Sequence, residues 1–187
     1  KDYAKAEPIL REVLVARRRH FGDDHLETAE AKYNLFNVLW NSDRREEAWP
    51  LLEEAVPVIR KVLGDDNPAG SVVLFKYAFE MILTEDELKA QPLMLGCLRA
   101  ERKKPGTTSG ILSGAELNVE MLLLADQPVP ARELAEELIL TAEMIDPNGW
   151  RQFAAKSMIG ESYTQEKKYP QAEPFLKAGY EGLRQQI

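Results

Sequence analysis

The sequence predicts an all-α fold, a right-handed superhelix of stacked antiparallel helix hairpins. One pattern recurs: a small residue near the start of a helix-period run returns at intervals of 42, 42, 41 and 41 residues. Such self-similarity is typical of an α-solenoid, in which each hairpin buries its apolar face against the next. No segment shows the two-residue alternation of a β-strand. The alanines that set this frame are Ala6, Ala48, Ala90, Ala131 and Ala172.

Residues 44–68 are the clearest copy of the repeat. Apolar residues at spacings of three and four predict a helix over 44–63, and the string Gly-Asp-Asp-Asn-Pro at 64–68 ends it. Pro50 lies inside this helix, where it removes one backbone hydrogen bond. Because prolines recur in register at Pro8, Pro92 and Pro174, we expect the fold to tolerate them.

The other elements follow in chain order. The turn at 22–24 repeats the later stop, Asn41-Ser42-Asp43 forms a second turn, and 104–109 is the loosest connection. The helix predicted at 70–84 is apolar nearly all round, which indicates burial on several sides or a groove. The predicted helices are 3–20, 26–41, 44–63, 70–84, 86–102, 110–125, 130–145, 150–165 and 168–185.

These helices form one predicted array over residues 1–187. It consists of a half repeat, 1–22, and full repeats at about 26–64, 68–104, 109–145 and 149–187. The chain would then begin in the second helix of one pair and stop after the second helix of another. We therefore expect a fragment that associates weakly end to end. The apolar stripes expected to be exposed at its ends are Ile9, Leu10 and Val13, and Phe175, Leu176 and Leu183.

Composition narrows the classes of function. The net charge of −7 argues against broad nucleic-acid binding. No apolar run approaches the roughly 18 to 20 residues that span a bilayer, so no membrane contact by this segment is predicted. The single cysteine, Cys97, lies on the apolar stripe of its helix and is expected in the core. We expect a cytoplasmic location, or an extracytoplasmic one if a membrane-spanning segment outside this sequence tethers the chain.

No catalytic residue, cofactor or metal site is predicted. His20 and His25 flank a turn that contains Asp23 and Asp24, which suggests a metal-binding loop. The equivalent turn at 64–68 keeps both aspartates but has no histidine. The preferred interpretation is therefore a turn that ends one helix before the next begins. The glycine-containing stretch at 106–110 is too short for a phosphate-binding loop and lacks its lysine.

Counted from each alanine of the frame, the pattern resembles the tetratricopeptide repeat. That repeat places a large apolar residue thirteen positions before the small one, and Asn118 departs from this rule. The period near 42 resembles the long variant found in kinesin light chains and in many bacterial proteins. The residues at the large position are Leu35, Tyr77, Asn118 and Ile159.

Residues 146–186 resemble the end of the repeat regions that follow the kinase domain in some bacterial serine/threonine protein kinases, planctomycete-type kinases above all. None of the kinase's own motifs is present. The resemblance implies a non-catalytic protein- or peptide-binding module, the C-terminal interaction region of a larger bacterial signalling protein. Two alternatives stay open: a regulatory array that senses a signalling peptide, and a self-association scaffold.

The resemblance also implies that a protein or peptide ligand binds the concave face, which the first helices of the pairs line. Asn34 matches the family's asparagine that hydrogen-bonds a peptide backbone, and Lys76 would supply a cation for a carboxylate. The alternatives are a solvated Asn34, and core packing for Phe75, Phe79 and Trp40. The full predicted set is Tyr33, Asn34, Asn37, Trp40, Phe75, Lys76, Phe79, Asn118, Met121, Ser157 and Glu161.

Overall fold

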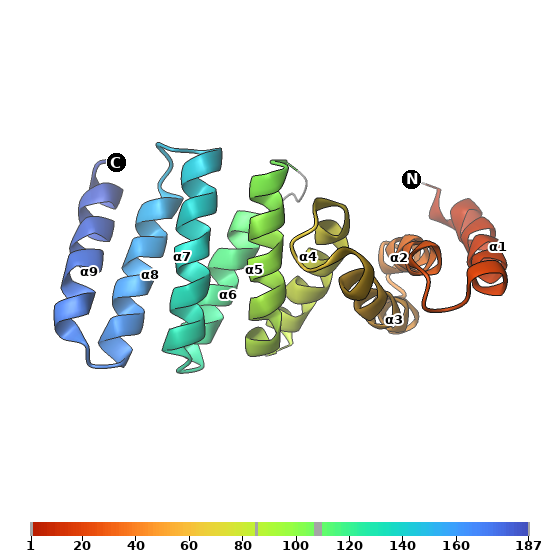
Figure 1. The fold of residues 1–187 in the computed structure, drawn as a ribbon, viewed down its shortest axis with the longest axis horizontal. Coiled ribbons are helices and arrows are strands. Elements are labelled where there is room, and N and C mark those ends of the chain that lie inside the picture. The colour runs from red at the N-terminus through yellow and green to blue at the C-terminus, as the bar shows by residue number, and fades with distance from the viewer. Residues whose placement is uncertain (1, 85, 107–109, 187) are drawn as a thin grey trace. The chain divides into compact units, whose positions relative to one another are not determined.

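The computed structural model describes residues 2–84, 86–106 and 110–186, and their regular structure is entirely helical. The all-α fold class of helix hairpins predicted from the sequence is confirmed. Figure 1 shows the helices in chain order. They are α1 (Tyr3–Phe21), α2 (Leu26–Trp40), α3 (Arg45–Leu63), α4 (Pro68–Leu83), α5 (Glu87–Lys103), α6 (Ile111–Leu124), α7 (Pro128–Ile145), α8 (Arg151–Gln165) and α9 (Tyr169–Arg184).

The ends of the helices follow rules that the sequence already contains. Gly22 and Gly64 end α1 and α3 with φ of 86° and 83°, and each N–H donates to a carbonyl four residues back. Two helices begin earlier than predicted, because Pro68 and Pro128 lie inside their first turns. Proline suits that position, since its missing N–H would have no partner there.

The prolines predicted inside helices are found there, and all lie on exposed faces. Pro8, Pro50, Pro92 and Pro174 are within α1, α3, α5 and α9. A carbonyl freed by the missing N–H can therefore bond to water. This explains how the same defect recurs without breaking the helices.

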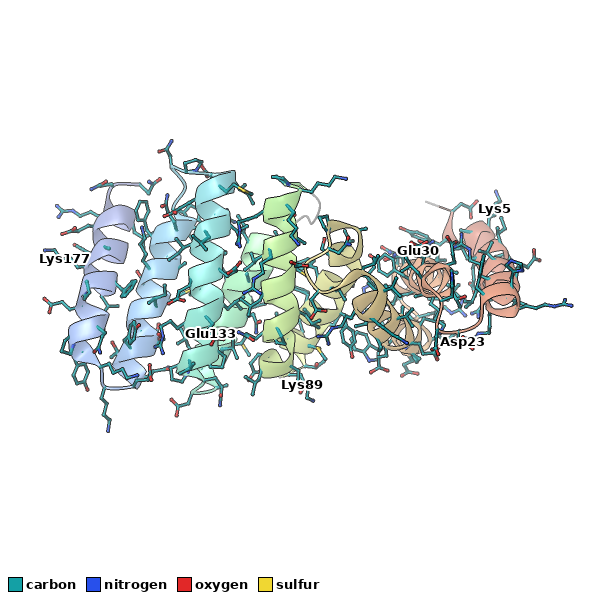
Figure 2. All side chains as sticks on the ribbon, viewed as in Figure 1. Lys5, Asp23, Glu30, Lys89, Glu133 and Lys177 are labelled. Atoms are coloured by element: carbon teal, nitrogen blue, oxygen red, sulfur yellow. The ribbon has the colours of Figure 1, made fainter. Side chains whose placement is uncertain are left out.

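The chain forms two compact units, and the first, Lys1–Gly64, holds α1 to α3. In it α2 packs against both α1 and α3. Ala48 is fully buried, as its place in the repeat predicts, and the α2 side chains Leu35 and Phe36 fill the interior. Lys32 is only 3% exposed, and its Nζ lies 3.2 Å from Asp23, labelled in Figure 2, and 3.0 Å from Glu54. This buried charge is compensated, as burial requires.

The second unit, Asp65–Ile187, holds α4 to α9. Contacts between α4, α6 and α8 place these helices in one layer, and the contact between α5 and α7 defines the other (Figure 1). Ala90 and Ala131 are fully buried, and Ala172 is nearly so. Four alanines of the frame read from the sequence therefore lie inside the protein, whereas Ala6 of α1 is half-buried.

Cys97 is also buried in this unit, as predicted. Its thiol donates to the carbonyl of Ser71 at 3.5 Å, and burial raises its pKa to about 12. A thiol held neutral in this way is a poor nucleophile. Cys97 is therefore a packing residue.

Candidate functional site

The second unit has an open pocket between α4 and α6, with a volume of about 480 Å³. Phe75 and Phe79 form one wall, with ring centroids 5.9 Å apart. A Cβ at Gly114 would come within 2.6 Å of the Phe75 ring, so this glycine lets the ring approach α6. The sequence left open whether these two phenylalanines bind a ligand or pack in the core. They do pack against the neighbouring helix, and they also line the pocket. The lining residues are Phe75, Lys76, Phe79, Gly110, Ser113, Gly114 and Leu117.

Lys76 reaches this pocket with its charge already compensated. Its Nζ lies 2.6 Å from Oε1 of Glu80, one helical turn further along α4. A ligand carboxylate would have to compete with Glu80 for the ammonium group. The assignment of Lys76 as a cation for a ligand carboxylate stays a prediction.

A second pocket, of about 330 Å³, lies between α6 and α8 in the same unit. Glu161 was in the predicted set, and the other residues were not. The repeat interval could have found two of them: Glu120 lies 41 positions after Phe79, and Met158 lies 82 positions, two intervals, after Lys76. The residues that line this pocket are Glu120, Leu123, Leu124, Met158, Glu161 and Gln165.

Two predicted site residues of α6 and α8 lie in packing contacts instead. Asn118 is 0% exposed, and its Nδ2 donates to the carbonyl of Glu87 at 3.0 Å. It occupies the repeat position that is buried as Leu35 and Ile159 elsewhere. Ser157 donates to the carbonyl of Phe153 at 3.3 Å, and its Oγ would be 2.1 Å from a Cβ at Gly179 of α9.

The burial of Asn118 has a geometric cause. Each residue of an α-helix is rotated about 100° from its neighbour, so a slip of one position moves a side chain from an open face toward the interior. The residue in register with Lys76 is Leu117, not Asn118. Ser157 is half-buried and lies two intervals after Phe75, so its place in the site stays a prediction. Met121 is half-buried and lines neither pocket.

Four predicted residues belong to α2 of the first unit. Burial raises the pKa of Tyr33, and a hydrogen bond with Asn37 opposes that rise. Trp40 packs against Phe36 in a tilted arrangement, with ring centroids 5.3 Å apart, and lies under the guanidinium of Arg45. These contacts make Trp40 part of the packing, while Asn34 is exposed.

The carboxylates on α6 and α8 differ in their burial and in their ion-pair partners. Glu116 lies 3.2 Å from Nε of Arg151, yet burial raises the pKa of its carboxyl group. Glu120 and Glu161 are exposed, and within the part of the chain that the structure describes neither forms an ion pair or hydrogen bond.

The two histidines lie at the ends of helices. His25 Nδ1 accepts a hydrogen bond from the N–H of Glu27 at 3.2 Å and so caps α2. Over residues 2–84, 86–106 and 110–186, no three His, Cys, Asp or Glu side chains are grouped as a metal site would require. None of the helices in those ranges is both long enough and apolar enough to cross a bilayer.

Two stretches match the tetratricopeptide repeat. They are residues 1–27 and 28–69, and the second stretch is as long as the repeat interval read from the sequence. The match ends at residue 69, although the alanines of the later repeats keep the frame. A search of the curated proteins found no match.

Solved structures extend the likeness to nearly the whole chain. Two structures of a protein described as a kinesin light chain with nearly identical TPR-like repeats, from Podosopora anserina, match with a TM-score of 0.57. The matches cover 98% of this chain and 88% of that one, at 16% identity. They show that the fold is a tetratricopeptide-type α-solenoid. The kinase likeness of residues 146–186 has no counterpart among these matches.

Proposed function

We propose that this chain is a protein- or peptide-binding tetratricopeptide module without catalytic chemistry of its own. The observation that carries the proposal is the open pocket of Phe75, Phe79 and Leu117 between α4 and α6. Aromatic side chains around a solvent-open pocket gain free energy when a partner covers them. The exposed Asn34 of α2 is proposed as a further contact in the first unit.

The likeness of residues 146–186 to kinase-linked repeat regions supports a finer proposal. In it the chain is the interaction region of a larger bacterial signalling protein, such as a serine/threonine kinase. A module of this kind would recruit a substrate or regulator to the attached domain. Identifying the domain that shares the reading frame with these residues tests this directly, and an unrelated neighbour would contradict it.

A binding screen tests the function itself. The purified chain is probed with an array of random decapeptides, and selected peptides are measured in solution by fluorescence anisotropy. Phe79→Ala should weaken a selected peptide about tenfold, the usual cost of truncating a buried aromatic anchor. Leu140→Ala is the matched control, because Leu140 is an exposed apolar residue on α7. The proposal fails if no peptide binds, or if the two variants bind alike.

A further inference from the structure

The α6–α8 pocket carries two carboxylates that have no cation beside them. Glu80 of α4 and Glu116 of α6 are paired with Lys76 and Arg151. Glu120 and Glu161 line the pocket, and among the described residues neither has an ion-pair partner. The pocket thus carries negative charge that the described residues leave uncompensated.

Gln165 adds a third acceptor to the same pocket. Its Nε2 donates to the carbonyl of Leu123 at 2.8 Å. A carbonyl oxygen only accepts hydrogen bonds, so this contact fixes which end of the amide carries the nitrogen. Oε1 is then left shielded from solvent and without a donor. A buried acceptor without a partner is costly, so a donor that enters the pocket and reaches Oε1 would gain free energy.

The walls of the pocket are apolar. Leu124 is 81% exposed, Leu123 is buried, and Met158 is half-buried. Methionine adapts its shape to an incoming group because it is unbranched and flexible. The pocket therefore combines an alkyl-binding wall with two carboxylates, and none of its lining residues is a lysine or an arginine.

We propose that this pocket binds the side chain of a lysine or arginine in a partner peptide. The alkyl stem would lie against Leu124 and Met158, while the cationic head would pair with Glu120 and Glu161 and donate to Oε1 of Gln165. Lysine and arginine combine a long apolar stem with a charged donor, which is the chemistry that the pocket complements. This inference rests on the proposed peptide-binding function and specifies which peptides it selects.

The test is a double-mutant cycle on a peptide chosen by the array from basic sequences. The peptide is used with its lysine or replaced by norleucine, which keeps the stem and removes the charge. The protein is used as the wild-type chain and as Glu120→Gln/Glu161→Gln. The control is Glu136→Gln/Glu173→Gln, which removes two exposed carboxylates from α7 and α9 and makes the net charge less negative by the same amount.

With the wild-type chain and the control, norleucine should weaken binding about tenfold, as for a charge-assisted contact. With Glu120→Gln/Glu161→Gln, lysine and norleucine peptides should bind alike, because the pairing groups are gone. A lysine preference that survives in this variant overturns the inference, as does an array that selects no basic residue, and both outcomes leave peptide binding intact. An array with no binder overturns the inference and the proposed function together. Thermal melts of all variants check that each is folded.

Discussion

At the scale of single residues, two helix caps show how one repeat position can use different chemistry. His25 caps α2 through Nδ1, 3.2 Å from the N–H of Glu27. The residue 42 positions later, Asn67, caps α4 through Oδ1, 2.8 Å from the N–H of Ala69. Only a neutral imidazole can accept this bond, whereas an amide accepts it at any ordinary pH. The repeat therefore contains its own non-titrating replacement for His25.

We expect the cap formed by His25 to stabilise the first unit. His25→Ala leaves the N–H of Glu27 without its acceptor and should lower the unfolding free energy by about 1 kcal/mol, the usual value of an N-cap. His25→Asn keeps an acceptor at this position, as Asn67 does in the next repeat, and should retain most of this free energy.

Urea unfolding of the wild-type chain, His25→Ala and His25→Asn at one pH measures this contribution. His20→Ala serves as the control, because His20 lies in the last turn of α1 and does not cap a helix N-terminus. Equal unfolding free energies for the wild type and His25→Ala would show that the cap contributes nothing.

Sequence reasoning succeeded at this scale where a residue's role follows from its place in the repeat. Ala48 and Ala90 are fully buried, and this was predictable because a small residue recurs at the same position of each hairpin. The partners of Lys76 and Lys32 were not foreseen, since an ion pair depends on which rotamers the packing allows. The depth of the α4–α6 pocket was likewise not predictable, because it depends on how closely Phe75 approaches Gly114.

At the scale of elements, the α8–α9 hairpin is held by glycines that let two helices touch. A Cβ at Gly179 would lie 2.9 Å from the carbonyl oxygen of Phe153 and from the backbone nitrogen of Ser157. A Cβ at Gly182 would lie 2.0 Å from the ring of Phe153. The ring can turn away, but the backbone of α8 cannot, so Gly179 is the stricter position.

Gly179→Ala should therefore destabilise the second unit, although alanine is the better helix former. Alanine gains about 1 kcal/mol of helix propensity over glycine, while the overpacked contact costs about 1 to 3 kcal/mol. We expect a net loss and a lower melting temperature by calorimetry. Glu181→Ala, an exposed change on the same helix, should leave the melting temperature nearly unchanged. A more stable Gly179→Ala chain would mean that the helices separate at no cost.

The helices themselves were predictable almost completely, and the site on them was not. Periodicity, glycine stops and turn residues place each helix within a few residues of its observed bounds. A binding surface needs the register of every helix to the residue, as Asn118 and Leu117 illustrate. Neighbouring positions of one helix face different sides. A comparison between repeats therefore identifies site residues only when the 41-residue interval is applied without a shift of even one position.

At the scale of the whole molecule, exposed apolar side chains on the first and last helices support weak self-association as a second property. Ile9 and Val15 on α1 are 61% and 66% exposed, and Leu176 and Tyr180 on α9 are 41% and 64% exposed. Apolar groups of this size gain free energy when a second copy covers them.

Sedimentation velocity at rising concentration should show a rising weight-average sedimentation coefficient. The variant Val15→Glu/Tyr180→Glu should lose this concentration dependence, because it places charge in both apolar faces. A coefficient that stays constant for the wild-type chain up to high concentration would contradict self-association. This outcome would leave the peptide-binding proposal untouched, since the two pockets lie on α4, α6 and α8.

The measurement that tests the peptide-binding surface most directly is a map of where a selected peptide contacts the chain. Amide chemical shifts of the isotope-labelled protein are followed by NMR as the peptide is added. The largest changes are expected along α4, α6 and α8, around Phe79, Leu117 and Glu120, the residues that line the two open pockets. Changes confined to α5 and α7, with these positions unaffected, would contradict the assignment of this surface as the binding site.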